Sequence, residues 1–153
     1  MCSSDLYAVY GGNGLRGYAS KFSHEGDYVL IGRQGALCGN VNYASGKFWA
    51  SEHALVAIPA ATFDTRWLGE LLRVLDLGQY SVAAAQPGIS AEVIGALTIP
   101  VPPIEEQRAI VEYLEGALGE IDELKRALLR SLDLLSQRRA ALIAEAVTGQ
   151  LTI

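Results

Sequence analysis

The sequence has 153 residues, half of them apolar, which suits one domain with an appendage. It contains neither a run of about eighteen apolar residues nor a basic leader, so we expect no membrane span and no secretory signal. Two cysteines indicate a reducing, cytoplasmic setting, and the net charge of −5 argues against simple electrostatic binding to nucleic acid.

The first hundred residues predict a small α+β domain with many turns. A strand is expected from Leu6 to Tyr10, and a glycine-rich loop follows over Gly11–Tyr18. This loop is either a tight turn between strands or a DNA-facing loop, because no Gly-Lys-Ser/Thr follows it as a nucleotide loop requires. Later strands are expected at 27–33, 37–43, 47–50 and 53–58. The first strand has no earlier element to pair with, so we expect residues upstream to be missing.

Two helices and a last strand complete this domain. Asp64 is predicted to cap a helix from about Thr65 to Leu77 that Gly78 ends. Ser90 is predicted to cap a short helix, and Leu97–Val101 reads as the final strand. The apolar face of the first helix is expected to be Trp67, Leu68, Leu71, Leu72 and Leu75.

The stretch from Pro100 to Gly149 predicts one long helix. Pro102-Pro103 can precede a helix, Glu105-Glu106 suit its first turn, and Gly149 suits its C′ position. About 45 residues would reach roughly 65–70 Å, which exceeds the width of a small domain. We therefore expect the helix to need a second long helix, in this chain or another.

Apolar residues along this stretch recur at alternating steps of three and four, which predicts a coiled-coil seam. Lys125 and Arg139 occupy the two steps that the series skips. The alternative is an amphipathic helix that breaks near Gly116–Gly119 and folds back as a hairpin, since glycine weakens a helix. The predicted seam is Val111, Leu114, Leu118, Ile121, Leu128, Leu132, Leu135 and Leu142.

Catalytic and metal-binding patterns are weak. His53, between Glu52 and an apolar strand, reads as a structural histidine, and His24 reads as a surface residue. Cys38 reads as a buried thiol in a strand, and no Cys/His cluster has metal-ligand spacing. A small enzyme using His53 and Glu52 is kept as a rival hypothesis, but the sequence predicts no active site.

Polar side chains in and beside the turns are instead suited to reading DNA. Arginine can bond guanine through two hydrogen bonds, and asparagine or glutamine can bond adenine in the same way. The predicted DNA contacts are Asn13, Arg16, Arg33, Gln34, Asn40, Lys47 and Gln86.

Motifs over nearly the whole chain resemble those of type I restriction–modification specificity subunits. The helical region carries Pro102-Pro103-Ile104-Glu105-Glu106-Gln107 at its start and Thr148-Gly149 at its end. The front resembles a target recognition domain of these subunits through 10–14, 32–36, 51–54 and 86–90. On this resemblance, 1–103 is an N-terminally incomplete recognition domain, and 104–150 is a long helix that pairs as an antiparallel coiled coil.

The resemblance implies a non-catalytic subunit that reads half of a bipartite site in double-stranded DNA. Two methyltransferase subunits would dock on it and use S-adenosylmethionine, while the specificity subunit itself holds no cofactor and no metal. A motor-nuclease subunit would join for restriction. A full subunit has two recognition domains and two helices, so this chain is either a fragment or a half-subunit that homodimerises through its helix. A structural dimerisation protein without DNA specificity is the alternative function.

Overall fold

The computed structural model describes residues 6–81 and 87–149. They divide into a compact unit that ends at Val111 and a helical segment from Glu112 onward. Within the compact unit, two apolar clusters lie on opposite faces of a central three-stranded sheet. Helices cover one face of that sheet, and a four-stranded sheet covers the other. This confirms the predicted α+β class.

Two sheets contain all the named strands of the described chain. The four-stranded sheet has the order β2 (Gly14–Ala19), β1 (Tyr7–Gly11), β6 (Lys47–Ala50), β3 (His24–Glu25). Its β1 and β6 run parallel, and its other pairs are antiparallel. The three-stranded sheet is antiparallel, with the order β5 (Val41–Ala44), β4 (Tyr28–Gly32), β7 (Ala54–Ala57).

Strand β4 is the centre of the domain because both of its faces are covered. Successive side chains of a strand point to opposite faces. Val29 and Ile31 accordingly join the cluster under the helices, while Leu30 joins Ala44 and Phe48 between the sheets. This explains why the sequence of β4 is apolar at consecutive positions rather than alternating.

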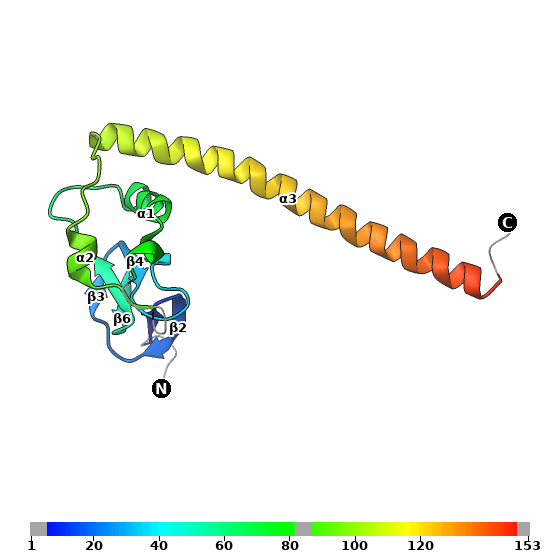
Figure 1. Cartoon of the computed structure of the whole chain (residues 1–153), viewed down its shortest axis with the longest axis horizontal. Coiled ribbons are helices and arrows are strands. Elements are labelled where there is room, and N and C mark those ends of the chain that lie inside the picture. The colour runs from blue at the N-terminus through cyan, green and yellow to red at the C-terminus, as the bar shows by residue number, and fades with distance from the viewer. Residues whose placement is uncertain (1–5, 82–86, 150–153) are drawn as a thin grey trace. The chain divides into compact units, whose positions relative to one another are not determined.

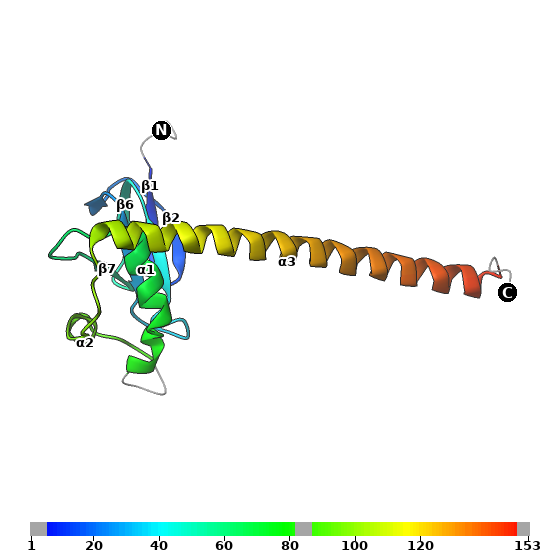
Figure 2. The same cartoon turned by 90° about the horizontal axis from the view of Figure 1, so that it is seen from above.

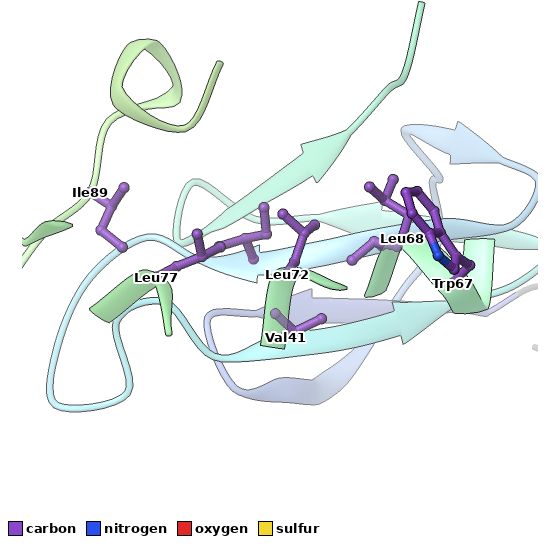
Figure 3. Packing of buried hydrophobic residues seen from close by; sticks show 8 residues of the cluster. Val41, Trp67, Leu68, Leu72, Leu77 and Ile89 are labelled. Carbon is purple, nitrogen blue, oxygen red and sulfur yellow. The ribbon is translucent and has the colours of Figure 1, made fainter. Parts of the chain in front are cut away.

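Helix α1 (Thr65–Val74) packs the largest apolar side chains onto the three-stranded sheet. Figure 3 shows Leu72 of α1 next to Val41, with Leu68 and Trp67 on one side of it and Leu77 and Ile89 on the other. Asp64 caps α1 by accepting from the backbone N–H groups of Arg66 and Trp67, and Ser90 caps α2 (Ala91–Gly95). Both predicted caps are confirmed.

Several sequence predictions for this domain are wrong in ways that long-range contacts explain. The predicted strand 37–43 is reduced to Val41–Ala44, since 36–39 form a turn in which Gly39 lies against the backbone of Gly78. Leu97–Val101 forms no strand; Leu97 and Ile99 pack on the core as irregular chain. The glycine-rich stretch Gly11–Tyr18 does contain the tight turn between strands that was one of the two expectations, but most of it is strand β2, whose extent was not predicted.

The end of the first helix and the place of His24 also differ from prediction. Helix α1 stops at Val74, and Asp76, not Gly78, takes the left-handed conformation with φ of 43° before the short helix η2 (Leu77–Tyr80). His24 is partly buried, because its ring stacks on buried Phe48 with ring centroids 5.4 Å apart.

Helix α3 (Ile104–Val147) has 44 residues and is continuous. Figures 1 and 2, seen from two directions, both show it running without a break, so the hairpin alternative is wrong. Glu105 and Glu106 occupy the first turn, and Gly149 has the positive φ (71°) expected after the last turn. Within 6–81 and 87–149, no helix is long and apolar enough to cross a membrane.

The first two turns of α3 belong to the compact unit. Gln107 is 1% exposed; its Oε1 accepts from the backbone N–H of Asp64 and its Nε2 donates to the carbonyl of Pro102, both at 2.9 Å. Ile110 and Val111 pack against the helix-side core. The Glu-Glu-Gln motif therefore joins the start of α3 to the cap of α1.

Candidate nucleic-acid interface

Three loops meet at one end of the two sheets and line an open cavity of about 450 Å³. They are the β1–β2 turn, the segment after β4, and the connection between β6 and β7. The side chains and backbone that line the cavity belong to Gly12, Asn13, Arg16, Gln34, Gly35, Ala36, Leu37 and His53. Asn13, Arg16 and Gln34 were predicted DNA contacts, so the fold gathers residues that are up to 21 positions apart.

Two glycines permit this approach of backbone to backbone. A Cβ atom at Gly32 would collide with the carbonyl oxygen of Gly12 and would lie 2.8 Å from that of Leu37. A Cβ atom at Gly12 would lie 3.1 Å from the carbonyl oxygen of His53. The first and third loops can reach the end of β4 only because these side chains are absent.

Backbone hydrogen bonds fix the segment that carries Gln34. The N–H of Arg33 donates to His53 O at 2.9 Å, and Arg33 O accepts from the N–H of Ile89 at 2.9 Å. On the other side, the N–H of Gly35 donates to Pro87 O at 3.0 Å. Gln34 is therefore held between two neighbouring segments while its side chain remains exposed.

A β-bulge directs Arg16 toward the cavity. Val9 pairs with Gly17 and Tyr10 pairs with Leu15, so Arg16 is the extra residue between these pairs. Bulges redirect side chains in this way. The aliphatic part of Arg16 lies over Gly11, where a Cβ atom would collide with it. The aliphatic part of the Arg16 side chain thus packs on Gly11, while the residue remains exposed to solvent.

Asn13 and Asn40 are joined directly, since Asn40 Nδ2 donates to Asn13 Oδ1. Arg33 is exposed next to Gln34. The fold therefore brings five of the seven predicted contacts to one region, with Asn40 and Arg33 beside the cavity rather than in its lining.

The sequence missed His53 as a member of this site. Its Nδ1 lies 3.1 Å from Gln34 Oε1, and its Nε2 lies 3.1 Å from Glu52 Oε1. Both ring nitrogens have a partner, as expected of a structural histidine, but the side chain is also 37% exposed and lines the cavity. Its position next to Gln34 depends on the pairing of β4 with β7, which local sequence does not reveal.

Lys47 and Gln86 are not placed at this cavity. Lys47 opens β6, and because β6 runs parallel to β1 with Ala50 opposite Tyr10, Lys47 lies toward the other end of the sheet. Its Nζ is 3.9 Å from Glu25 Oε1 and lies over the ring of Phe22. Gln86 lies outside the described residues.

Cys38 is part of a turn and is only partly buried, so the prediction of a buried thiol in a strand is wrong. Its thiol donates to Arg33 O at 3.4 Å, and burial raises the pKa of Cys38 above its ordinary value. A thiol with a raised pKa is a poor nucleophile at neutral pH. Among 6–81 and 87–149, no three His, Cys, Asp or Glu side chains cluster as metal ligands.

A family model described as the type I restriction modification DNA specificity domain matches residues 7–133. The EcoprrI specificity subunit of a type I restriction enzyme from Escherichia coli is 40% identical over 126 residues. That match covers 80% of this chain and 31% of the relative. The chain therefore spans about a third of the length of this curated relative.

Two solved structures share the fold. A chain from a study of complex assembly and conformational transition in the type I restriction–modification system aligns with a TM-score of 0.77 and 24% identity. It covers 95% of this chain and 41% of that one. The S subunit of a type I restriction–modification system from M. genitalium aligns with a TM-score of 0.59 and 18% identity, over 81% of this chain and 36% of that one.

Proposed function

Because this chain belongs to the type I restriction–modification DNA specificity family, we propose that it reads one half of a bipartite site in double-stranded DNA. The observation that supports this most directly is the cavity where three loops meet and whose lining includes Asn13, Arg16 and Gln34. Arginine and amide side chains are the groups that distinguish base edges in the major groove. Their backbones are fixed by hydrogen bonds, so their positions are set before DNA arrives.

The net negative charge of the chain limits how it can bind DNA. With a net charge of −5, the chain cannot draw DNA in through its overall field. Arg16 and Arg33 are the cations nearest the predicted contact residues. The remaining phosphate contacts are assigned to partner methyltransferase subunits, which carry S-adenosylmethionine and methylate adenine. The chain itself then acts as a non-catalytic cytoplasmic subunit, joined by a motor-nuclease subunit for restriction.

The long helix α3 supports the assembly part of the proposal. From Leu118 onward every described residue of α3 is exposed, including Ile121, Leu128, Leu132 and Leu135 at 57–63%. Leucines repeating at this spacing are stabilised by a second helix. We assign that helix to a second copy of this chain or to another specificity chain, with Leu114 and Leu142 toward the ends of the seam.

The charges of α3 favour antiparallel pairing. Residues 104–124 carry seven acids and one base, whereas 125–149 carry five bases and two acids. Parallel pairing would place like charges side by side, whereas antiparallel pairing places opposite charges together. An antiparallel alignment can set Leu118 opposite Leu135 and Ile121 opposite Leu132, so it keeps seam residues in contact, and the charges are what favour this orientation.

The test is selection of sequences from randomised duplexes by the chain assembled with its methyltransferase subunits. We expect enrichment of a bipartite site, with binding that weakens as salt increases because phosphate contacts release counterions. If the complex assembles but enriches no sequence, the chain is a helix-mediated structural dimerisation protein instead. The cavity residues carry the proposal, so Arg16→Ala should lower the enrichment.

A further inference from the structure

Gln34 has a fixed backbone and an exposed side-chain amide. Its neighbours Arg33 and Gly35 are bonded to His53 O and Pro87 O, and Gln34 itself bridges to Gly88. His53 makes two contacts with this segment. Its backbone carbonyl accepts from the N–H of Arg33, and its ring lies beside the side chain of Gln34. The ring of His53 and the amide of Gln34 are therefore aligned by the same backbone contact.

The ring of His53 lies between two oxygen atoms. Its Nε2 is 3.1 Å from Glu52 Oε1, and its Nδ1 is 3.1 Å from Gln34 Oε1. A carboxylate only accepts hydrogen bonds, so Nε2 must carry a proton. A neutral imidazole has one N–H, which leaves Nδ1 without a proton to give to Gln34 Oε1.

Two arrangements resolve this conflict. In the first, His53 is doubly protonated and Nδ1 donates to Gln34 Oε1, so the amide NH₂ of Gln34 faces the cavity. In the second, His53 is neutral and its Nδ1 accepts from the amide NH₂ of Gln34, so the amide oxygen faces the cavity. The Gln34 side chain then offers either donors or an acceptor to a base edge.

We propose that His53, held by Glu52, is a positioning residue that selects which side of the Gln34 amide reads the base. A donor face suits the O6 and N7 atoms of guanine or the O4 atom of thymine, and an acceptor face suits the amino groups of adenine and cytosine. The inference rests on the proposed function. Arg16, from β2, is the charged side chain in the described cavity lining, and its guanidinium keeps one charge throughout.

The experiment repeats the duplex selection with the assembled complex at about pH 5.5 and about pH 8, which bracket the range in which histidines ordinarily titrate. For the parent chain, the preferred base at one position should change from one that presents acceptors at low pH to one that presents an amino group at high pH. Glu52→Ala and His53→Ala should remove this pH dependence and lower discrimination at that position about tenfold.

Two further variants sharpen the result. Gln34→Glu offers only acceptors, so its preference should match that of the parent at high pH under both conditions. Glu92→Ala removes an equal, exposed charge from α2 and should behave as the parent does. The side chain of Glu52 is 77% exposed, so Glu52→Ala should fold normally. This variant therefore tests the role of His53 even where His53→Ala fails to fold.

The outcomes separate this inference from the function on which it rests. If the parent complex enriches no sequence, the proposed function fails. If the parent enriches a site and the Glu52→Ala variant keeps the same base preferences and pH dependence at every position, DNA reading stands and the role of His53 is wrong.

Discussion

Some residues of this protein are important because they lack a side chain and so let two backbone segments approach each other. Gly32 is buried, and a Cβ atom there would enter the carbonyl of Gly12. Backbone cannot move aside as the end of a flexible side chain can. The approach of the loops therefore depends on that missing methyl group.

Gly32→Ala should lower the free energy of unfolding by about 1–3 kcal/mol, because the β1–β2 turn must be displaced. Gly17→Ala is the matched control, since no atom lies within 4 Å of a Cβ atom at that position. Urea denaturation of both variants measures the difference. Equal midpoints would show that the loops do not depend on the contact.

Arg16→Ala should weaken binding of the selected DNA site by about 1–3 kcal/mol if its guanidinium contacts a base. Lys47→Ala removes the same charge, but Lys47 lies away from the cavity beside Glu25, so a change within about 0.5 kcal/mol is expected. Titration of the assembled complex with labelled duplex compares the two. An equal loss would mean that only overall charge matters.

At the scale of elements, two junctions hold the domain together: α1 against β5, and the start of α3 against the cap of α1. Both use polar side chains within apolar surroundings. A buried polar group is stabilising only when its hydrogen bonds are complete. Each junction can therefore be tested by removing one side chain.

Gln107→Ala should lower the free energy of unfolding by about 1–3 kcal/mol, because the N–H of Asp64 and the carbonyl of Pro102 lose their shared partner. Gln137→Ala removes the same side chain from an exposed position of α3, where it bonds only to Asp133, and should change little. Thermal unfolding monitored by circular dichroism suits both. A larger effect at Gln137 would contradict the assignment.

Tyr43 of β5 makes the junction between α1 and β5 sensitive to high pH. Burial, and then the hydrogen bond from its hydroxyl to Glu70 at 2.9 Å, raise the pKa of Tyr43 to about 12. An unfolded tyrosine loses its proton near pH 10, so the folded state binds more protons between these values. This contribution to stability is present below about pH 10 and is lost as the pH rises through about 12.

The parent should therefore lose more stability between about pH 10 and 12 than a Tyr43→Phe variant, which has no hydroxyl to titrate. Tyr113→Phe is the control, because that side chain is 75% exposed on α3. Unfolding curves across this pH range compare the three chains. Identical slopes for the parent and the Tyr43 variant would refute the effect.

At the scale of the whole molecule, α3 is one continuous helix (Figure 1). A row of its leucines is exposed to solvent. Burial of apolar surface is the main favourable term in association. Such a row is stabilised when a second helix covers it. The proposed antiparallel partner meets this need and matches the charges.

Leu132→Glu should abolish helix pairing, because it buries an unpaired carboxylate opposite Ile121 of the partner helix. Leu134→Glu adds the same charge to a leucine that is 63% exposed and lies outside the seam, so pairing should persist. Light scattering of the assembled complex gives the number of copies. A Leu132 variant with unchanged mass would show that the seam is wrongly assigned.

The sequence by itself determined α3, both caps and the apolar faces of α1. These features depend on contacts between residues three or four positions apart. Such contacts can be predicted from local sequence, as the spacing of Leu68 and Leu72 and the position of Asp64 show. The central strand β4 was also predicted, since a short run of aromatic and aliphatic residues that includes Val29 and Ile31 is typical of a buried strand.

Only the tertiary structure decided which loops form the candidate site. Gly12, Gln34 and His53 meet because β4 pairs with β7 and two glycines let backbones touch, and such contacts leave no periodic pattern in the sequence. The pairing of β4 with β7 brought His53 in, and the parallel pairing of β6 with β1 placed Lys47 toward the other end of the sheet. Local physics therefore fixed the helix, while the base-reading surface depended on how distant segments packed.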